Sequence, residues 1–307
     1  MNEAMFWGGI GNGAVNCVLC PHRCKIPGGS AGFCGVRRNI GGTLYAESYG
    51  KNSVIALDPI EKKPLYMFHP GKHVLSIGGY GCNLRCPFCQ NSDISMEYEK
   101  TWQAAEILAP EDIAALAVGT LPRGNIGAAY TYNEPLIGYE FVRDCAGLVR
   151  EAGLCNVLVT NGYVNPEPLE ALLPLIGAMN IDLKGFTEGF YKRLGGNLEA
   201  VKETIALARQ HCHVEIAALI IPGENDSEDE IMGLARWVAS LDPEIPLHLT
   251  RFFPRYQYAG RAATPRETVW RLRDAAGRYL KNVFAGNMRQ PRKGCLPLFE
   301  LNLPHIF

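Results

Sequence analysis

The chain has 307 residues, of which 47% are hydrophobic and 20% are charged, and its formal net charge is −1. A chain of this size and apolar content can bury a sizeable core as one large α/β domain with an appendage. The near-zero charge gives no field that would attract nucleic acid or an anionic membrane, so we expect neither partner. The sequence has neither a long apolar run nor a basic leader followed by an apolar one, which predicts a cytoplasmic protein.

Residues 1–73 form a small N-terminal region rich in glycine, cysteine and turn signals. The spacing C-x2-C-x3-C-x9-C in this region is formed by Cys17, Cys20, Cys24 and Cys34. Clustered cysteines in a large chain without a secretory leader favour metal binding over disulfides. Four soft ligands are enough for one tetrahedral thiolate site, so we expect a metal site here, with zinc and an iron–sulfur cluster both open. His22 is an alternative ligand to one of the cysteines.

The segment 58–66 combines charge and proline, and we expect it to lead from the N-terminal region to a strand at Val74–Gly78. Three cysteines follow that strand in the spacing C-x3-C-x2-C, namely Cys82, Cys86 and Cys89. A closed zinc site needs four ligands, and the loop of a two-cluster ferredoxin reads C-x2-C-x2-C, so neither pattern fits. Three thiolates match three corners of an iron–sulfur cube and leave its fourth iron open for another ligand.

From residue 74 to residue 288, short β-like runs alternate with amphipathic segments. The predicted strands after the first are Gly127–Tyr132, Asn156–Thr160, Met179–Leu183, Val214–Ile221 and Leu247–Thr250. Pro110, Pro135 and Pro166 are predicted to open helices between them. Six such units predict an α/β fold with a curved parallel sheet and helices outside, which binds ligands at the carboxyl ends of its strands. Residues 289–307 are expected to form a C-terminal tail.

The cysteine spacing, with Phe88 directly before the last cysteine, resembles the signature of the radical S-adenosylmethionine (radical SAM) enzymes. Further segments resemble one subgroup, the AmmeMemoRadiSam-system radical SAM enzymes, which are relatives of pyruvate formate-lyase activating enzyme. These segments are residues 20–24, 32–37, 58–66, 81–86 and 130–135. The resemblance implies a partial (β/α)6 TIM-like barrel, a [4Fe-4S] cluster on Cys82, Cys86 and Cys89, and SAM bound to the open iron.

The resemblance also implies residues for binding SAM. Glu134 lies in a segment similar to the Gly-Gly-Glu-Pro motif that binds the SAM amino group, although Tyr132 and Asn133 replace the two glycines. Asn161, after the third strand, would lie near the ribose. The alternative for Glu134 is a carboxylate that favours the first turn of a helix, and the alternative for Asn161 is a polar residue of a strand-to-helix turn.

Asp182 and Lys184 end the fourth strand and point to the same face, and a corresponding Asp-Leu-Lys helps to position SAM in activase-like members. His248 on the sixth strand is similar in placement to a histidine near SAM in that group. A structural ion pair and a hydrogen-bonded core histidine are the respective alternatives.

The implied function is that of a radical SAM enzyme: reductive cleavage of SAM gives a 5′-deoxyadenosyl radical, which abstracts hydrogen from an unidentified small molecule, peptide or protein. The alternative is an activating enzyme that generates a glycyl radical on a partner protein. Activases usually carry His-Asn-Pro after the last cysteine, whereas this chain has Gln90-Asn91-Ser92. Either function needs an electron donor such as flavodoxin or ferredoxin.

Overall fold

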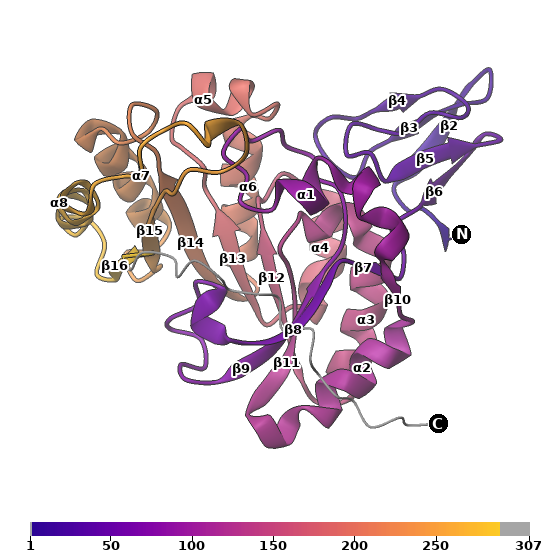
Figure 1. Ribbon diagram of the computed structural model, residues 1–307, viewed down its shortest axis with the longest axis horizontal. Helices are drawn as coiled ribbons and strands as arrows, with labels where there is room; N and C mark the ends of the chain where they lie inside the picture. The colour runs from indigo at the N-terminus through magenta and orange to yellow at the C-terminus, as the bar shows by residue number, and fades with distance from the viewer. Residues whose placement is uncertain (1, 289–307) are drawn as a thin grey trace.

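The computed structural model describes residues 2–288, and its centre is an eight-stranded sheet (Figure 1). From one edge to the other, the strands are β16 (Val283–Gly286), β15 (Leu247–Arg251), β14 (His213–Ile220), β13 (Ala178–Asp182), β12 (Cys155–Thr160), β11 (Asn125–Thr131), β9 (His73–Gly78) and β8 (Val54–Pro59). All neighbours are parallel except β8 and β9, which are antiparallel. The edge strands β16 and β8 do not pair with each other, so the barrel is partial, as predicted.

The six predicted strands are all present, and their ends differ from the prediction by only one or two residues. Their sequences are nearly continuous apolar runs because both faces are covered, as β14 shows with six of its eight residues in fully buried positions and the other two partly buried. The sheet begins earlier than residue 74, since β8 pairs along its whole length with β9. The first two residues of segment 58–66, which was expected to lead into the barrel, therefore already belong to strand β8 of the sheet.

The helices are α1 (Ser92–Ser95), α2 (Pro110–Gly119), α3 (Tyr139–Glu151), α4 (Pro166–Leu172), α5 (Glu188–Arg193), α6 (Leu198–Ala208), α7 (Glu228–Leu241) and α8 (Arg266–Ala276). Pro110 and Pro166 stand at the first positions of α2 and α4, where the missing N–H costs nothing. Pro135 instead opens a 3₁₀ turn, Pro135–Gly138, that leads into α3. Short 3₁₀ turns also lie at Ile60–Lys62, Tyr98–Lys100, Trp102–Ala104, Leu121–Arg123, Leu173–Leu175 and Tyr256–Tyr258.

The N-terminal region consists of two small antiparallel sheets, consistent with its many turn signals. One contains β1 (Asn2–Glu3), β6 (Thr43–Ala46) and β5 (Arg37–Ile40), and the other contains β2 (Trp7–Gly11), β3 (Ala14–Cys17) and β4 (Lys25–Ile26). A further pair joins β7 (Lys51–Asn52) to β10 (Glu106–Ile107). In Figure 1 the two three-stranded sheets lie at the upper right, beside the end of the barrel that carries α1.

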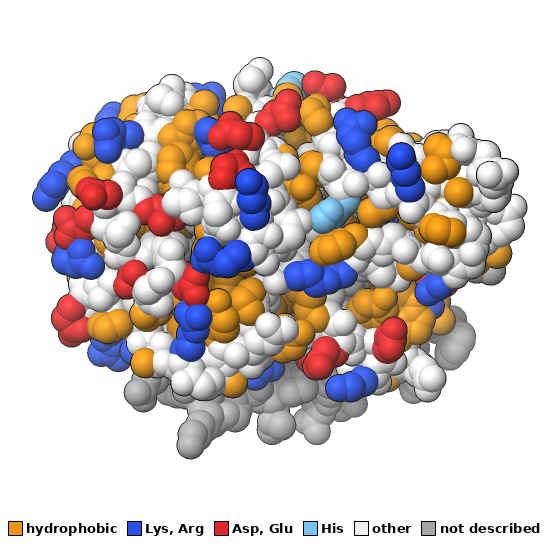
Figure 2. Space-filling view, turned by 90° about the horizontal axis from the view of Figure 1, so that it is seen from above, with side chains coloured by type: hydrophobic (Ala, Val, Ile, Leu, Met, Phe, Trp, Pro, Cys, Tyr) orange, Lys and Arg blue, Asp and Glu red, His pale blue; other side chains and the backbone are white. Residues whose placement is uncertain are grey.

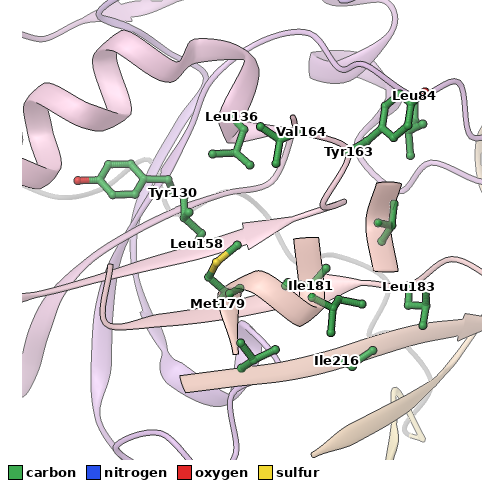
Figure 3. Packing of buried hydrophobic residues seen from close by; sticks show 14 of the residues in the cluster. Leu84, Tyr130, Leu136, Leu158, Tyr163, Val164, Met179, Ile181, Leu183 and Ile216 are labelled. Carbon is green, nitrogen blue, oxygen red and sulfur yellow. The ribbon is translucent and has the colours of Figure 1, made fainter. Parts of the chain in front are cut away.

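The main core lies between the barrel sheet and its helices. Figure 3 shows part of it, from Tyr130 and Leu158 through Met179 and Ile181 to Ile216. Within residues 2–288, no helix is both long and apolar enough to cross a bilayer. The tail predicted at residues 289–307 lies outside the described residues.

Candidate functional site

The loop between β9 and α1 carries Cys82, Cys86 and Cys89 at the carboxyl end of the first parallel strand. Leu84 anchors this loop, because its side chain is fully buried and lies beside Tyr163 at one end of the core (Figure 3). The backbone N–H of Arg85 donates to the carbonyl of Leu194 at 2.8 Å. Packing and a backbone hydrogen bond therefore hold this loop in place.

Asn133 fixes the start of the same loop. Its Oδ1 accepts from the N–H of Gly79 at 2.9 Å, and its Nδ2 donates to the carbonyl of Gly81 at 3.1 Å. An asparagine side chain thus supports the cysteine loop at a position where the resembling motif has glycine. Its residue type gave no indication of this role, which depends on contacts more than 50 positions away in sequence.

Burial dominates the environment of the three thiols. It raises the pKa of Cys82 and of Cys89, and it raises that of Cys86 to about 12, while the positive charge of Lys184 opposes the shift at Cys86 and Cys89. Thiolates in such a place need a bound cation to offset their charge. Three thiols on one loop match three of the four ligand positions of a [4Fe-4S] cluster.

Glu134 connects the carboxyl ends of β11 and β12. Its Oε1 accepts from the Leu136 N–H at 3.0 Å and the Thr160 hydroxyl at 2.7 Å, and its Oε2 accepts from the Asn161 N–H at 2.7 Å. The carboxylate is only 2% exposed, and burial raises its pKa to about 7 against the opposing effect of these donors. Oε2 accepts one protein hydrogen bond, so it can take another from an ammonium group.

Asn161 reaches towards the cysteine loop. Its Nδ2 donates to Asn83 Oδ1 at 2.9 Å and lies 3.7 Å from Cys82 Sγ, while its Oδ1 accepts from the Tyr163 N–H at 2.8 Å. Gly162 makes this turn possible with φ +69°, and a Cβ there would lie 2.9 Å from Ile181. The amide is engaged by protein groups at both ends, and a contact with a ribose stays a prediction.

Asp182 and Lys184 lie at the carboxyl end of β13 as an ion pair of 2.6 Å. Burial opposes the charge of Lys184, yet Asp182 and the two nearby cysteines, Cys86 and Cys89, raise its pKa. Lys184 also acts electrostatically on Glu134. The ammonium group therefore lies among the cysteines, Glu134 and Asp182, so the ion pair and the candidate site are the same place.

His248 has a different position. It is 1% exposed, its Nε2 lies 2.6 Å from Glu215 Oε2, and its ring stacks on Phe284. Glu215 also accepts from the backbone N–H groups of Tyr66 and Met67 at 3.0 and 2.7 Å. The described contacts thus place His248 in a hydrogen-bonded network that fastens segment 58–66 and the residues just after it to β14. They do not bring it together with the cysteine loop.

A second buried network lies at the start of the same segment. Lys63 Nζ pairs with Asp58 at 2.8 Å, and the hydroxyl of Tyr132 donates to Asp58 at 2.5 Å. Burial lowers the pKa of Lys63 to about 8, whereas the paired charges hold the pKa of Asp58 well below its usual range. Asp58 and Lys63, two charged residues of the segment expected to lead into the barrel, are therefore buried structural groups.

The four N-terminal cysteines gather around one small cavity, and Cys17 and Cys34 are buried. His22 also lines this cavity, but its Nε2 is engaged by the carbonyl of Asn83 at 2.8 Å. The predicted grouping of the cysteines is thus present in the structure. Asn83 and Asn133 are site residues without a recognisable sequence signal of their own.

Residues 76–235, more than half of the chain, match the family described as the Radical SAM superfamily. The chain is 42% identical over 292 residues to "Uncharacterized protein MJ0808" of Methanocaldococcus jannaschii, a match that covers 94% of this chain and 86% of that protein. It is 26% identical over 165 residues to pyruvate formate-lyase 1-activating enzyme of Escherichia coli, covering 52% of this chain and 66% of that enzyme.

The fold is similar to that of a radical SAM methyltransferase from Sphaerobacter thermophilus, with a TM-score of 0.53 and 15% identity. That match covers 71% of this chain and 67% of the methyltransferase. The family match and the extensive similarity to the archaeal protein agree with the geometry of the cysteine loop. The chain belongs to the radical SAM superfamily and is related to the pyruvate formate-lyase activating enzymes.

Proposed function

We propose that this protein is a radical SAM enzyme that abstracts hydrogen from a substrate over the carboxyl ends of β9, β11, β12 and β13. The observation that carries the proposal is the convergence of three thiols, two of them buried, one buried carboxylate and one partly buried ammonium at these four strand ends. When bound, a [4Fe-4S] cluster and SAM supply one-electron cleavage of a C–S bond and a 5′-deoxyadenosyl radical.

The cysteine loop would hold the cluster through Cys82, Cys86 and Cys89. Lys184 offsets part of the negative charge of these thiolates, because its charge favours the ionised form of Cys86 and Cys89. The N–H of Leu84, at 3.4 Å, and the amide of Asn161 both donate to Cys82 Sγ. Such donors stabilise the more negative, reduced state of a cluster.

Glu134 would take the ammonium of SAM through Oε2, the oxygen with a single protein donor. Lys184 and Asp182 lie beside Glu134 as a pair of opposite charges. The Lys184 ammonium suits the carboxylate of SAM, and the Asp182 carboxylate suits a cationic part of SAM. His248 has no role in this proposal, because Glu215 already engages its Nε2.

The substrate would approach past Phe88, which lies between two other aromatic rings. Phe88 stacks on Phe190 with centroids 6.1 Å apart and also lies 6.1 Å from the ring of Tyr258. In this proposal these rings would help to exclude water from the cysteine loop, which a reactive radical requires. On the face seen in Figure 2, positive and negative side chains are interspersed.

The proposal is tested by anaerobic reconstitution with iron and sulfide, followed by measurement of 5′-deoxyadenosine released from SAM after reduction with dithionite. We expect release by the wild-type protein and by the control Cys212→Ala, and none by Cys82→Ala, Cys86→Ala or Cys89→Ala. A wild-type protein with a full cluster that releases no deoxyadenosine, with or without anaerobic cell extract as substrate source, would contradict the proposal.

The alternative function, generation of a glycyl radical on a partner protein, is favoured by the similarity to the E. coli activating enzyme. The two functions differ in the product. With an activase, a persistent organic radical appears on a protein in the macromolecular fraction of the extract. An enzyme that acts on a small molecule instead cleaves SAM when the low-mass fraction of the extract is added. Electron paramagnetic resonance of the two fractions, with reduced flavodoxin or ferredoxin as donor, separates them.

A further inference from the structure

The N-terminal cysteines form a site that the radical SAM reaction does not require. Cys17 ends β3, and its N–H donates to the carbonyl of Cys24 at 2.9 Å, which brings two of the ligands together. Arg23 closes the intervening turn with φ +44°. The N–H of Phe33 donates to Cys24 Sγ at 3.4 Å. All four cysteines are free thiols, and together they line one cavity with apolar neighbours such as Leu19 and Ile137.

The size of this cavity argues against a zinc ion. Zinc holds its sulfurs about 2.3 Å from a common centre, and four sulfurs at that distance leave no space for even a water molecule. Here the centre of a water-sized sphere can occupy about 10 Å³ of the cavity, so the space is wider than a single zinc ion needs. Four cysteines around a wider space suit a group larger than one ion.

The charge around the cavity also indicates a ligand. Arg37 lines the cavity and is 1% exposed, and its Nε–H has no acceptor among residues 2–288. A buried guanidinium N–H without an acceptor is costly. Thiolate or sulfide sulfur in the cavity would provide one.

The cavity is joined to the radical SAM loop by a chain of hydrogen bonds. His22 lies between Cys20 and Cys24 and is bonded to the carbonyl of Asn83, the residue after Cys82. The side chain of Asn83 accepts from Asn161, whose amide also donates to Cys82 Sγ. The two cysteine sets therefore share one connected network.

We propose that Cys17, Cys20, Cys24 and Cys34 hold a second [4Fe-4S] cluster with cysteine on all four irons, placed against the loop of the first. With no open iron, this cluster does not bind SAM. Instead it holds the segment that contains His22 in position. The hydrogen bond from His22 to Asn83 then helps to hold the neighbouring Cys82 in place.

The test counts iron, sulfide and zinc per chain in anaerobically prepared protein. The variant Cys82→Ala/Cys86→Ala/Cys89→Ala should retain about four irons and four sulfides, against about eight of each in the wild type. Its reduced electron paramagnetic resonance spectrum should not change when SAM is added, because no iron is open. Cys155→Ala/Cys212→Ala is the control for loss of unrelated cysteines and should match the wild type.

One zinc per chain in the triple variant, or no metal at all, would overturn the proposal. Since removal of the whole N-terminal set could unfold the region, Cys20→Ser is the second variant: we expect loss of about four irons with an unchanged unfolding temperature of the barrel. An unchanged iron content in Cys20→Ser would also contradict it. None of these outcomes depends on whether the protein cleaves SAM, so failure of the proposed reaction is distinguishable from failure of this inference.

Discussion

The side-chain amide of Asn161 lies 3.7 Å from the sulfur of Cys82, although the two residues belong to loops that follow different strands. The same amide is held by Asn83, and the N–H of Asn161 is held by Glu134. The carboxylate proposed to bind SAM and the cysteine proposed to bind iron are thus connected through one residue. A change at Asn161 should therefore be detectable in the redox properties of the cluster.

We expect Asn161→Ala to lower the reduction potential of the SAM cluster. Loss of one donor to a thiolate sulfur costs the reduced state about 1 kcal/mol, which corresponds to roughly 40 mV for a one-electron couple. A potentiometric titration of the reconstituted protein measures this shift, with the remote, partly exposed amide variant Asn282→Ala as control. Equal potentials in the two variants would show that Asn161 does not act on the cluster.

Lys184→Met should weaken SAM binding and reduce cluster retention. The substitution keeps the length of the side chain but removes the charge that favours the thiolates of Cys86 and Cys89, and it leaves Asp182 without its 2.6 Å partner. A lost interaction of about 1.4 kcal/mol corresponds to a tenfold change in affinity. Equilibrium binding of SAM to cluster-loaded protein provides the measurement. Lys192→Met on the neighbouring helix α5 is the control, and an equal effect there would refute a specific role for Lys184.

Glu215→Gln should destabilise the barrel in a pH-dependent way. Burial alone would raise the pKa of Glu215, but donors from His213, His248, Tyr66 and Met67 lower it from 4.5 to about 2. Because the folded pKa is depressed, the ionised group stabilises the fold above about pH 4.5, and this stabilisation is lost as the pH falls towards 2. At pH 7 the variant should lose about 2–3 kcal/mol of unfolding free energy.

Urea unfolding of both proteins between pH 7 and pH 3 tests this prediction. The difference between wild type and Glu215→Gln should be constant down to about pH 4.5 and should then narrow. The exposed carboxylate variant Glu199→Gln should show almost no difference at any pH. If the difference in unfolding free energy between wild type and Glu215→Gln stays constant from pH 7 to pH 3, Glu215 is not the group that titrates.

The sequence predicted the parts of this molecule that depend on local patterns. Runs such as Leu247–Thr250 are apolar enough to identify a strand, and prolines such as Pro110 mark helix starts because the ring fits the first turn. The spacing of Cys82, Cys86 and Cys89 identified the cysteine loop for a similar reason, since ligands close in sequence can share one loop.

What the sequence could not supply are contacts between distant segments. The charged residues Asp58 and Lys63 look like solvent-exposed groups until Tyr132 is placed against them. The sequence places His248 on a strand, but it does not show that Glu215 engages the Nε2 of this residue. In each case the side chain has two plausible environments, and tertiary packing, not composition, selects between them.

The contact between the two cysteine regions predicts the effect of one added methyl group. Gly81 has φ +78°, and a Cβ there would lie 2.7 Å from the carbonyl oxygen of Cys34, a backbone atom that cannot rotate away. Gly71 has nearly the same conformation, φ +77°, with nothing within 4 Å of its Cβ position. Both Gly81→Ala and Gly71→Ala impose left-handed strain of about 1–2 kcal/mol, but only Gly81→Ala pushes the two regions apart.

We therefore expect Gly71→Ala to lower the unfolding free energy modestly and to leave iron content and SAM cleavage unchanged. Gly81→Ala should cost a further 1–3 kcal/mol or so, because the cysteine loop must move away from Cys34. It should also lower deoxyadenosine release at equal protein concentration and shift the visible spectrum of the bound iron. If the two alanine variants behave alike, the N-terminal region does not constrain the loop, because the added methyl group would then be accommodated without displacing Cys82.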